Sequence, residues 1–292
     1  MKIVGTFVDV RSEVAGAPVV LVPTMGFLHE GHVSLLELAH GLEGRVVMSL
    51  FVNPLQFDRS VDLERYPRDL ERDAGIAEAA GVDLLFAPAV EEMYPSPPRT
   101  RVKVDSVSEG MEGEHRPGHF EGVATVVAKL FAGIRPDAAV FGRKDAQQLA
   151  VVRRLTADLS FPVEIIGAPT VRAPDGLAVS SRNVFIAEDD REAALGLSSG
   201  LFAAAAAVTA GERNAVRLES LVRDRLADAE VEYVTLADAF EAEPIDILDR
   251  EAFLAVAARV GEVRLIDNIV VWPDGSTDTG VRLEQPSILR RA

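Results

Sequence analysis

Two histidines close together carry the first chemical signal of this chain. His29 and His32 end the segment V-P-T-M-G-F-L-H-E-G-H, with Gly31 between them. An apolar run before it and an amphipathic stretch after it predict a strand, a tight turn and a helix that begins at the imidazoles. A first helical turn has unpaired N–H groups and favours negative charge, and histidine can donate to phosphate oxygens. The segment therefore predicts a phosphate-binding turn, and two surface histidines that open a helix are the alternative.

Two further polar clusters follow along the chain. F-V-N-P-L-Q-F contains Asn53 and Gln56, whose amides suit a neutral polar ligand, although Asn-Pro is also a common start of a capped turn. H-R-P-G-H-F-E-G contains Arg116 and His119 in a basic loop. Such a loop could bind an anion or simply be a charged surface loop, and both interpretations stay open.

A lysine at the start of a predicted helix marks the fourth cluster, F-G-R-K-D-A-Q-Q-L. Lys144 and Gln148 lie four residues apart, which places both on one helical face. A lysine at a helix N-terminus opposes the helix dipole, so a nearby anion best explains it. The Walker A pattern G-x-x-x-x-G-K-[ST] is absent from this segment.

The fifth cluster is P-T-V-R-A-P-D-G-L-A-V-S-S-R-N, residues 169–183. Its hydroxyls and the guanidinium of Arg182 follow a turn at Asp175-Gly176 and resemble a mobile phosphate clamp. A β-hairpin with a polar tip is the weaker alternative.

Composition limits the classes of protein that this chain could be. The 292 residues include no cysteine, which excludes disulfides and thiolate chemistry. The formal net charge of −16 repels nucleic-acid backbones, so an anionic ligand needs a local cluster of positive groups. No apolar run approaches the roughly 18 residues of a membrane span, and the N-terminal residues lack the form of a secretory signal. We expect a cytoplasmic protein without a membrane or nucleic-acid partner.

Apolar runs alternate with helical patterns over the first two thirds of the chain. Strands are predicted at residues 19–22, 46–51, 83–87, 138–141 and 163–166, and helices at 33–42, 70–80, 123–134 and 145–159. This alternation predicts an α/β fold with a doubly wound, Rossmann-like parallel sheet over residues 1–185, which binds ligands at the carboxyl ends of its strands.

The remaining residues, 186–292, predict a smaller α+β domain with an antiparallel sheet. Helical patterns cover residues 188–211 and 215–229, and β-like runs cover 231–236, 253–260 and 263–271. The polar, turn-rich tail at 273–292 is expected to be loosely attached.

Taken in order, these clusters resemble the pantoate–beta-alanine ligase (pantothenate synthetase) family of H-x-G-H nucleotidyltransferases. Y-P-R at 66–68 and L-I-D-N at 265–268 extend the resemblance over nearly the whole chain. It implies that ATP and pantoate form pantoyl adenylate and pyrophosphate, and that beta-alanine then displaces AMP to give pantothenate, the precursor of coenzyme A. It also implies Mg²⁺ with the nucleotide, and a homodimer.

The resemblance assigns roles by position, with His32 as the catalytic histidine and Gln56 and Gln148 as the pantoate-binding residues. ATP binding falls to Met25, Gly26, His29, Gly31, His32, Gly142, Arg143, Lys144, Asp145, Val171, Val179, Ser180, Ser181 and Arg182. We hypothesise that His29 and His32 stabilise the α-phosphate, and that Lys144 and Arg182 neutralise the leaving pyrophosphate. The S-S-R-N loop and the C-terminal domain are the candidate lid.

Two positions of this chain depart from the family pattern. Arg143 replaces the glutamate of G-E-K-D, and Val179 replaces a methionine.

The metal ligands and two rival functions stay open. Asp73 is a candidate metal ligand, but a solvated helical carboxylate is the simpler interpretation. One rival is a nucleotidyltransferase that acts on a phosphorylated alcohol, and the other is a nucleotide-binding protein without turnover.

Overall fold

The computed structural model describes residues 1–57, 63–64 and 66–287 and divides into two compact units. Unit 1 comprises Met1–Leu28, His32–Phe141 and Val151–Ala168. Unit 2 comprises His29–Gly31, Gly142–Ala150 and Pro169–Ala292. Both units are thus assembled from separate stretches of chain, and the domain boundary expected at residue 185 stays a prediction.

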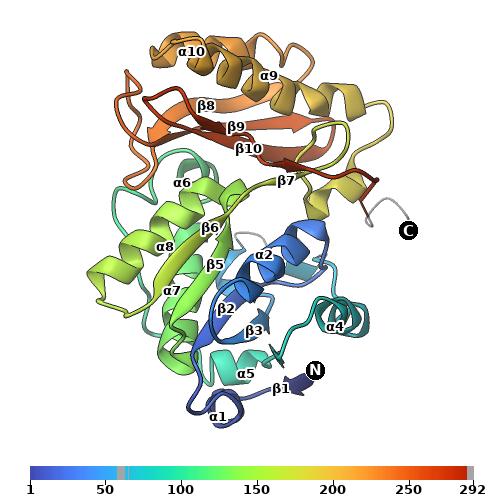
Figure 1. Cartoon of the computed structure of the whole chain (residues 1–292), viewed down its shortest axis with the longest axis vertical. Helices are drawn as coiled ribbons and strands as arrows, with labels where there is room; N and C mark the ends of the chain where they lie inside the picture. Colours follow the sequence, from blue (N-terminus) through green and yellow to red (C-terminus); the bar gives the residue numbers. More distant parts are fainter. Residues whose placement is uncertain (58–62, 65, 288–292) are drawn as a thin grey trace. The chain divides into compact units, whose positions relative to one another are not determined.

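Unit 1 is built on a six-stranded sheet with the order β1-β4-β3-β2-β5-β6, whose paired strands run parallel (Figure 1). The strands are β1 (Lys2–Val4), β2 (Val19–Thr24), β3 (Arg45–Leu50), β4 (Leu84–Phe86), β5 (Ala138–Gly142) and β6 (Glu164–Ala168). The first four residues of β2 are buried, which is typical of a strand covered on both faces. The predicted α/β class with a Rossmann-like parallel sheet is confirmed.

Seven α-helices and the 3₁₀ helix η1 of the described residues lie within the first 158 positions. They are α1 (Phe7–Glu13), α2 (Glu30–His40), η1 (Pro54–Gln56), α4 (Leu70–Ala79), α5 (Val90–Met93), α6 (Glu112–His115), α7 (His119–Ile134) and α8 (Ala146–Asp158). Polar caps set several starts: the Asp69 side chain accepts a hydrogen bond from Arg72 N at the start of α4, and Thr6 accepts one from Asp9 N at α1.

Unit 2 contains an antiparallel sheet with the order β11-β10-β9-β8. Its strands are β8 (Glu230–Asp238), β9 (Ala252–Val260), β10 (Val263–Val271) and β11 (Thr277–Asp278). Helices α9 (Arg191–Thr209) and α10 (Ala215–Arg223) lie together along this sheet (Figure 1). A Cβ on Gly196 would lie 2.4 Å from the carbonyl oxygen of Arg225, so glycine permits the close packing of α9. The predicted smaller α+β domain with an antiparallel sheet is thereby confirmed as a fold.

Unit 2 also holds short elements that carry several predicted site residues. These are η2 (Arg143–Asp145), β7 (Val171–Arg172), η3 (Ser181–Phe185) and β12 (Val281–Arg282), with β12 paired in parallel to β7.

The prediction of a loosely attached tail is wrong for residues 273–287. β11 pairs with β10, β12 pairs with β7, and the buried Ser287 places its Oγ 2.6 Å from Oε2 of Glu30. Backbone pairing needs no apolar pattern, which is why the polar composition was misleading. The last part of the predicted tail, 288–292, lies outside the described residues.

Helix α9 bears on the expectation that no segment approaches a membrane span. By length and composition it is the one described helix that could cross a membrane, and half of its most apolar stretch is buried. Leu197, Leu201 and Val208 of this helix belong to the core of unit 2, packed with strand residues of β9 and β10. Its apolar character is therefore explained by packing inside the unit.

Candidate active site

The turn after β2 is held by one buried carboxylate. Gly26 and Phe27 both have positive φ, +91° and +53°, which turns the next two backbone N–H groups toward Asp73. Oδ2 of Asp73 accepts from Phe27 N at 2.7 Å, and Oδ1 accepts from Leu28 N at 2.8 Å. A Cβ on Gly26 would lie 2.9 Å from Oδ2, so only glycine fits both the φ angle and the space.

Arg72 completes this clamp from the same helix. Its guanidinium donates to Oδ1 of Asp73 at 3.1 Å and to the carbonyl oxygen of Leu28 at 2.9 Å, and it lies 5.0 Å from the centre of the Phe27 ring. The interpretation of Asp73 as a solvated carboxylate is therefore wrong, since its side chain is 1% exposed. Its oxygens are engaged by backbone and guanidinium donors, which makes Asp73 a positioning residue for the turn.

His29 lies just before α2 and acts as its cap. The ring is buried, and Nδ1 accepts a hydrogen bond from Gly31 N at 3.1 Å. Because Nδ1 is an acceptor, the proton of the neutral ring lies on Nε2. A Cβ on Gly31 would lie 2.8 Å from Cε1 of His29, so this glycine lets the ring lie against the backbone. His32 is the third residue of α2 and is partly exposed. The predicted pairing of both imidazoles with one helix start is confirmed in this form.

Gln56 lies in a buried amide cluster after β3. Its Nε2 donates to Sδ of Met25 at 3.0 Å, and its Oε1 accepts from Nδ2 of Asn53 at 3.0 Å. Asn53 caps η1, donates also to the carbonyl oxygen of Gly122 and accepts from the hydroxyl of Tyr94 at 2.9 Å. The capped-turn interpretation is therefore correct for Asn53. Burial raises the pKa of Tyr94 to about 12, so its hydroxyl stays a hydrogen-bond donor at neutral pH.

The basic loop at the start of α7 contacts the backbone of Gln56. Nδ1 of His119 lies 2.9 Å from the carbonyl oxygen of Gln56, and Nε2 lies 3.1 Å from Nη1 of Arg116. Since a carbonyl only accepts and a guanidinium only donates, His119 is neutral with its proton on Nδ1. A Cβ on Gly122 would lie 2.3 Å from the carbonyl oxygen of Leu55, which explains the glycine of this motif. The anion-binding alternative for this loop finds no support in these contacts.

In unit 2, one cavity brings together the two cations expected to bind phosphate. Lys144 and Arg182 both line it, together with Ser180, Asn183 and Asp267. Oδ1 of Asn183 is buried and has no hydrogen-bond partner within the described part of the chain. Arg264 also lines the cavity, and three cationic side chains with an acceptor that lacks a partner suit anionic and hydroxyl groups of a ligand.

The loop that carries Lys144 is fixed by a side chain of β10. Nδ2 of Asn268 donates to the carbonyl oxygen of Arg143 at 2.9 Å and to that of Lys144 at 2.7 Å. Lys144 lies in η2, two residues before α8 begins, whereas the sequence pattern predicted it at the start of the helix. Gln148 lies partly buried in the first turn of α8. Arg143 pairs with Asp278 at 2.6 Å, so the residue that departs from the family pattern has an ion-pair partner within the chain.

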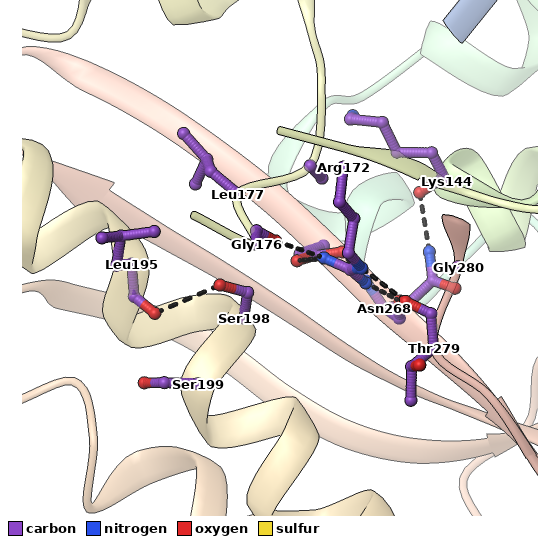
Figure 2. A network of polar contacts seen from close by, with 12 residues as sticks. Lys144, Arg172, Gly176, Leu177, Leu195, Ser198, Ser199, Asn268, Thr279 and Gly280 are labelled. Atoms are coloured by element: carbon purple, nitrogen blue, oxygen red, sulfur yellow. Dashed lines mark hydrogen bonds and ion pairs between the residues drawn. The ribbon is translucent and has the colours of Figure 1, made fainter. Parts of the chain in front are cut away.

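Behind this loop lies a buried arginine that the sequence analysis did not select. Arg172 is 1% exposed and forms two hydrogen bonds with Asp267, at 2.6 and 3.0 Å. Figure 2 shows the same guanidinium directed at Asn268, Gly176 and Thr279, whose carbonyl oxygens accept its remaining protons. Charged residues inside the apolar strands β7 and β10 were the signal that could have revealed this pair.

The fifth segment is a β-hairpin, as its weaker interpretation proposed, and it leads directly into η3. Val179 N donates to the carbonyl oxygen of Val171 at 2.8 Å, and both valine side chains are buried. Oγ of Ser180 accepts from Arg182 N at 3.3 Å, and the Arg182 side chain is exposed. The hairpin therefore anchors the loop, and the exposed guanidinium at its end can still act as a clamp.

The described residues thus form an α/β protein with a parallel sheet and a histidine-bearing turn after β2 and, in unit 2, a cavity lined by Lys144 and Arg182. The family model described as pantoate-beta-alanine ligase matches residues 2–270, so the chain belongs to that family. It is accordingly a ligase that condenses pantoate with beta-alanine.

Known proteins agree with this assignment in sequence and in structure. The pantothenate synthetase of Heliobacterium modesticaldum is 50% identical over 88% of this chain and 92% of its own length. That of Rhizorhabdus wittichii is 50% identical over 94% of this chain and 99% of its own. The crystal structure of pantothenate synthetase from Thermus thermophilus matches with a TM-score of 0.87 and 46% identity, covering 92% and 98% of the two chains. A pantoate-beta-alanine ligase from Francisella tularensis, complexed with beta-gamma ATP and beta-alanine, matches with a TM-score of 0.73 and 32% identity over 92% and 97%.

Proposed function

We propose that this chain carries out the ligase reaction in two steps with the residues described above. The carboxylate of pantoate attacks the α-phosphorus of ATP in line, and the bond to the pyrophosphate oxygen breaks. The amine of beta-alanine then attacks the acyl carbon of pantoyl adenylate and loses a proton, and AMP leaves with the bonding electron pair. The observation that carries the proposal is the cavity in unit 2 that Lys144 and Arg182 line together.

The protein supplies no covalent nucleophile in this scheme, so its work is positioning and charge stabilisation. His29 and His32 stabilise charge at the α-phosphate, and Lys144 and Arg182 neutralise the leaving pyrophosphate. Gln56 and Gln148 hold pantoate. The other nucleotide contacts are Met25, Gly26, Gly31, Gly142, Arg143, Asp145, Val171, Val179, Ser180 and Ser181.

Mg²⁺ fits this scheme as a companion of the nucleotide. The described residues contain no group of three or more His, Cys, Asp or Glu side chains that could hold a metal ion. Mg²⁺ commonly keeps waters and binds through substrate phosphates with one or two carboxylates, and Asp145 beside Lys144 is an exposed candidate. The ion would add positive charge at the phosphates.

Three further features belong to the proposal. The η3 loop and the C-terminal elements close over the reactive adenylate to exclude water. The enzyme works as a homodimer, which sedimentation velocity can measure. It acts in the cytoplasm on small molecules, without nucleic acid or membrane.

The first test is the exchange of labelled pyrophosphate into ATP with beta-alanine left out. We expect exchange that depends on pantoate, because adenylation is reversible and needs only the first two substrates. Exchange supported by a phosphorylated alcohol in place of pantoate would favour the rival nucleotidyltransferase. ATP binding without any exchange would favour a protein that binds nucleotide but has lost turnover.

Substitutions then assign the roles. His32→Ala and Lys144→Ala should each lower the exchange rate by about 10²–10³ while the melting temperature stays near that of the wild type. Gln56→Ala and Gln148→Ala should raise the KM for pantoate more than that for ATP. His40→Ala, at the exposed end of α2, and Lys103→Ala, on the exposed surface, are the matched controls and should leave exchange unchanged. Near-normal adenylation in either of the first two variants would contradict the assignment.

A further inference from the structure

The segment that follows the family match contacts the loops of unit 2 that carry the proposed nucleotide-binding groups. The match ends at residue 270, and we call residues 273–287 the C-terminal strap. β11 and β12 lie in this strap, and it runs beside β7 after leaving the edge of the antiparallel sheet. Its contacts therefore lie beyond the residues that the family model matches.

Backbone hydrogen bonds join the strap to the hairpin strand β7. Val281 N donates to the carbonyl oxygen of Thr170, and Leu283 N donates to that of Arg172, each at 2.8 Å. Gly280 has a φ of +88°, and a Cβ there would lie 2.2 Å from the carbonyl oxygen of Thr170. This close approach requires glycine, so the fit of the strap against the hairpin is specific.

A side-chain ion pair joins the strap to the loop of Lys144. Nη1 of Arg143 lies 2.6 Å from Oδ2 of Asp278, with side chains 28% and 21% exposed. The other carboxylate oxygen of Asp278 accepts from Gly280 N at 2.9 Å, which fixes its orientation. Arg143 is the residue immediately before Lys144, so movement of this pair displaces the backbone that carries the lysine.

Two more contacts show that the strap connects several of these segments. The carbonyl oxygen of Thr279 accepts from Nε of Arg172, in the network that also contains Asn268 and the carbonyl of Lys144 (Figure 2). At the far end, Oγ of Ser287 donates to Glu30, the residue that follows His29. One stretch of chain thus contacts the loop of Lys144, the hairpin and Glu30 at the start of α2.

We propose that the C-terminal strap positions the loop that carries Lys144, and that it does so through the ion pair between Arg143 and Asp278. The inference rests on the proposed function in one respect, that Lys144 binds the triphosphate. Asp278 neutralises the charge of Arg143, so that Arg143, besides its proposed contact with the nucleotide, acts through the position of Lys144. Glutamate at position 143, as in the family pattern, would face the carboxylate of Asp278.

A charge swap tests this inference. Arg143→Glu and Asp278→Arg each place like charges together, and Asp278→Asn removes the charge with little change in size. We expect each single variant to raise the KM for ATP roughly 5-fold, the typical strength of a partly exposed ion pair, with the KM for pantoate unchanged. The double variant R143E/D278R restores opposite charges and should return the KM for ATP to within about 2-fold of wild type.

The following measurements distinguish a loss of the positioning of Lys144 from a loss of protein stability and from failure of the proposed function. Binding of ATP measured by calorimetry should follow the same order as the KM values, and it does not depend on turnover. Arg250→Glu reverses an exposed ion pair elsewhere in unit 2 and serves as the control, with no change expected. The inference is overturned if the double variant is no better than the worse single variant, or if ATP binding stays at the wild-type level in all of them. Loss of pantoate-dependent exchange in the wild type would instead overturn the proposed function.

Discussion

Asp73 shows how a single residue can determine the shape of a site without touching a substrate. It accepts hydrogen bonds from Phe27 N and Leu28 N and pairs with Arg72 while almost fully buried. In Asp73→Asn, one side-chain oxygen becomes an NH₂ group that faces a backbone N–H. Because two donors then face each other in a buried place, we expect a loss of about 2–3 kcal/mol in the free energy of unfolding, measured by urea denaturation.

The matched control for this prediction is Glu71→Gln on the same helix. Glu71 is exposed, so its neutralisation should change the free energy of unfolding by less than about 0.5 kcal/mol. If Asp73→Asn were as mild as Glu71→Gln, the carboxylate would not hold the turn. A rise in the KM for ATP should accompany the loss of stability, since the same turn carries the nucleotide contacts of the proposed function.

The position of a residue in the site could be predicted from the sequence only where it follows from the residue type and from the spacing of neighbouring residues. His29 and His32 share one helix start, and Lys144 follows a strand end, so both features can be inferred from a few neighbouring residues. Asp73 meets partners 45 and 46 positions away, and Arg172 meets Asp267 95 positions away. A distant partner decides whether a charge is solvated or buried, and a single sequence does not contain that pairing.

Helix α7 and the short helix η1 are held together by a backbone contact that only glycine allows. A Cβ at position 122 would lie 2.3 Å from the carbonyl oxygen of Leu55, next to Gln56. We expect Gly122→Ala to destabilise the fold by about 1–3 kcal/mol and to raise the KM for pantoate, because η1 must shift and carries Gln56 with it. Steady-state kinetics with pantoate and ATP varied in turn, together with urea denaturation, measure both effects.

The control for this prediction is Gly75→Ala in α4, where a Cβ would meet no atom within 4 Å. Alanine in a helix should leave the fold unchanged or stabilise it by about 0.5–1 kcal/mol. If Gly122→Ala behaved like Gly75→Ala, the close contact of α7 with η1 would not position Gln56.

Elements were predictable from the sequence where their own residues define them. The apolar runs of β2, β3 and β5 and the helical periodicity of α4 and α8 match the structure to within about two residues. The short strands β1, β11 and β12 were missed because strands of two or three residues exist only through pairing with distant segments. Helix α7 begins at His119, four residues before its predicted start, because the basic loop folds into its first turn. Helix α10 ends at Arg223, six residues earlier than predicted.

At the scale of the whole molecule, unit 2 comprises three separate stretches of chain, so no single cut in the sequence divides unit 1 from unit 2. Unit 2 takes in Pro169 onward, and Leu177 belongs to its core cluster. A boundary at residue 185 would leave the hairpin out, although Arg172 neutralises the buried Asp267 and β7 pairs with β12. The boundary predicted at residue 185 precedes the alanine-rich helix, and the ion pair of Arg172 with Asp267 joins residues on the two sides of it.

Two C-terminal fragments test which boundary completes the unit. A fragment of residues 169–292 retains Arg172, whereas one of residues 186–292 leaves Asp267 as a buried charge without its cation, a loss typically of about 3–5 kcal/mol. We expect the longer fragment to melt cooperatively in circular dichroism and the shorter one to melt at a clearly lower temperature or not at all. Arg172→Met in the longer fragment should reproduce the behaviour of the shorter one, because it removes the cation and keeps the apolar stem. Equal melting of the three fragments, folded or unfolded, would show that the boundary does not depend on this ion pair.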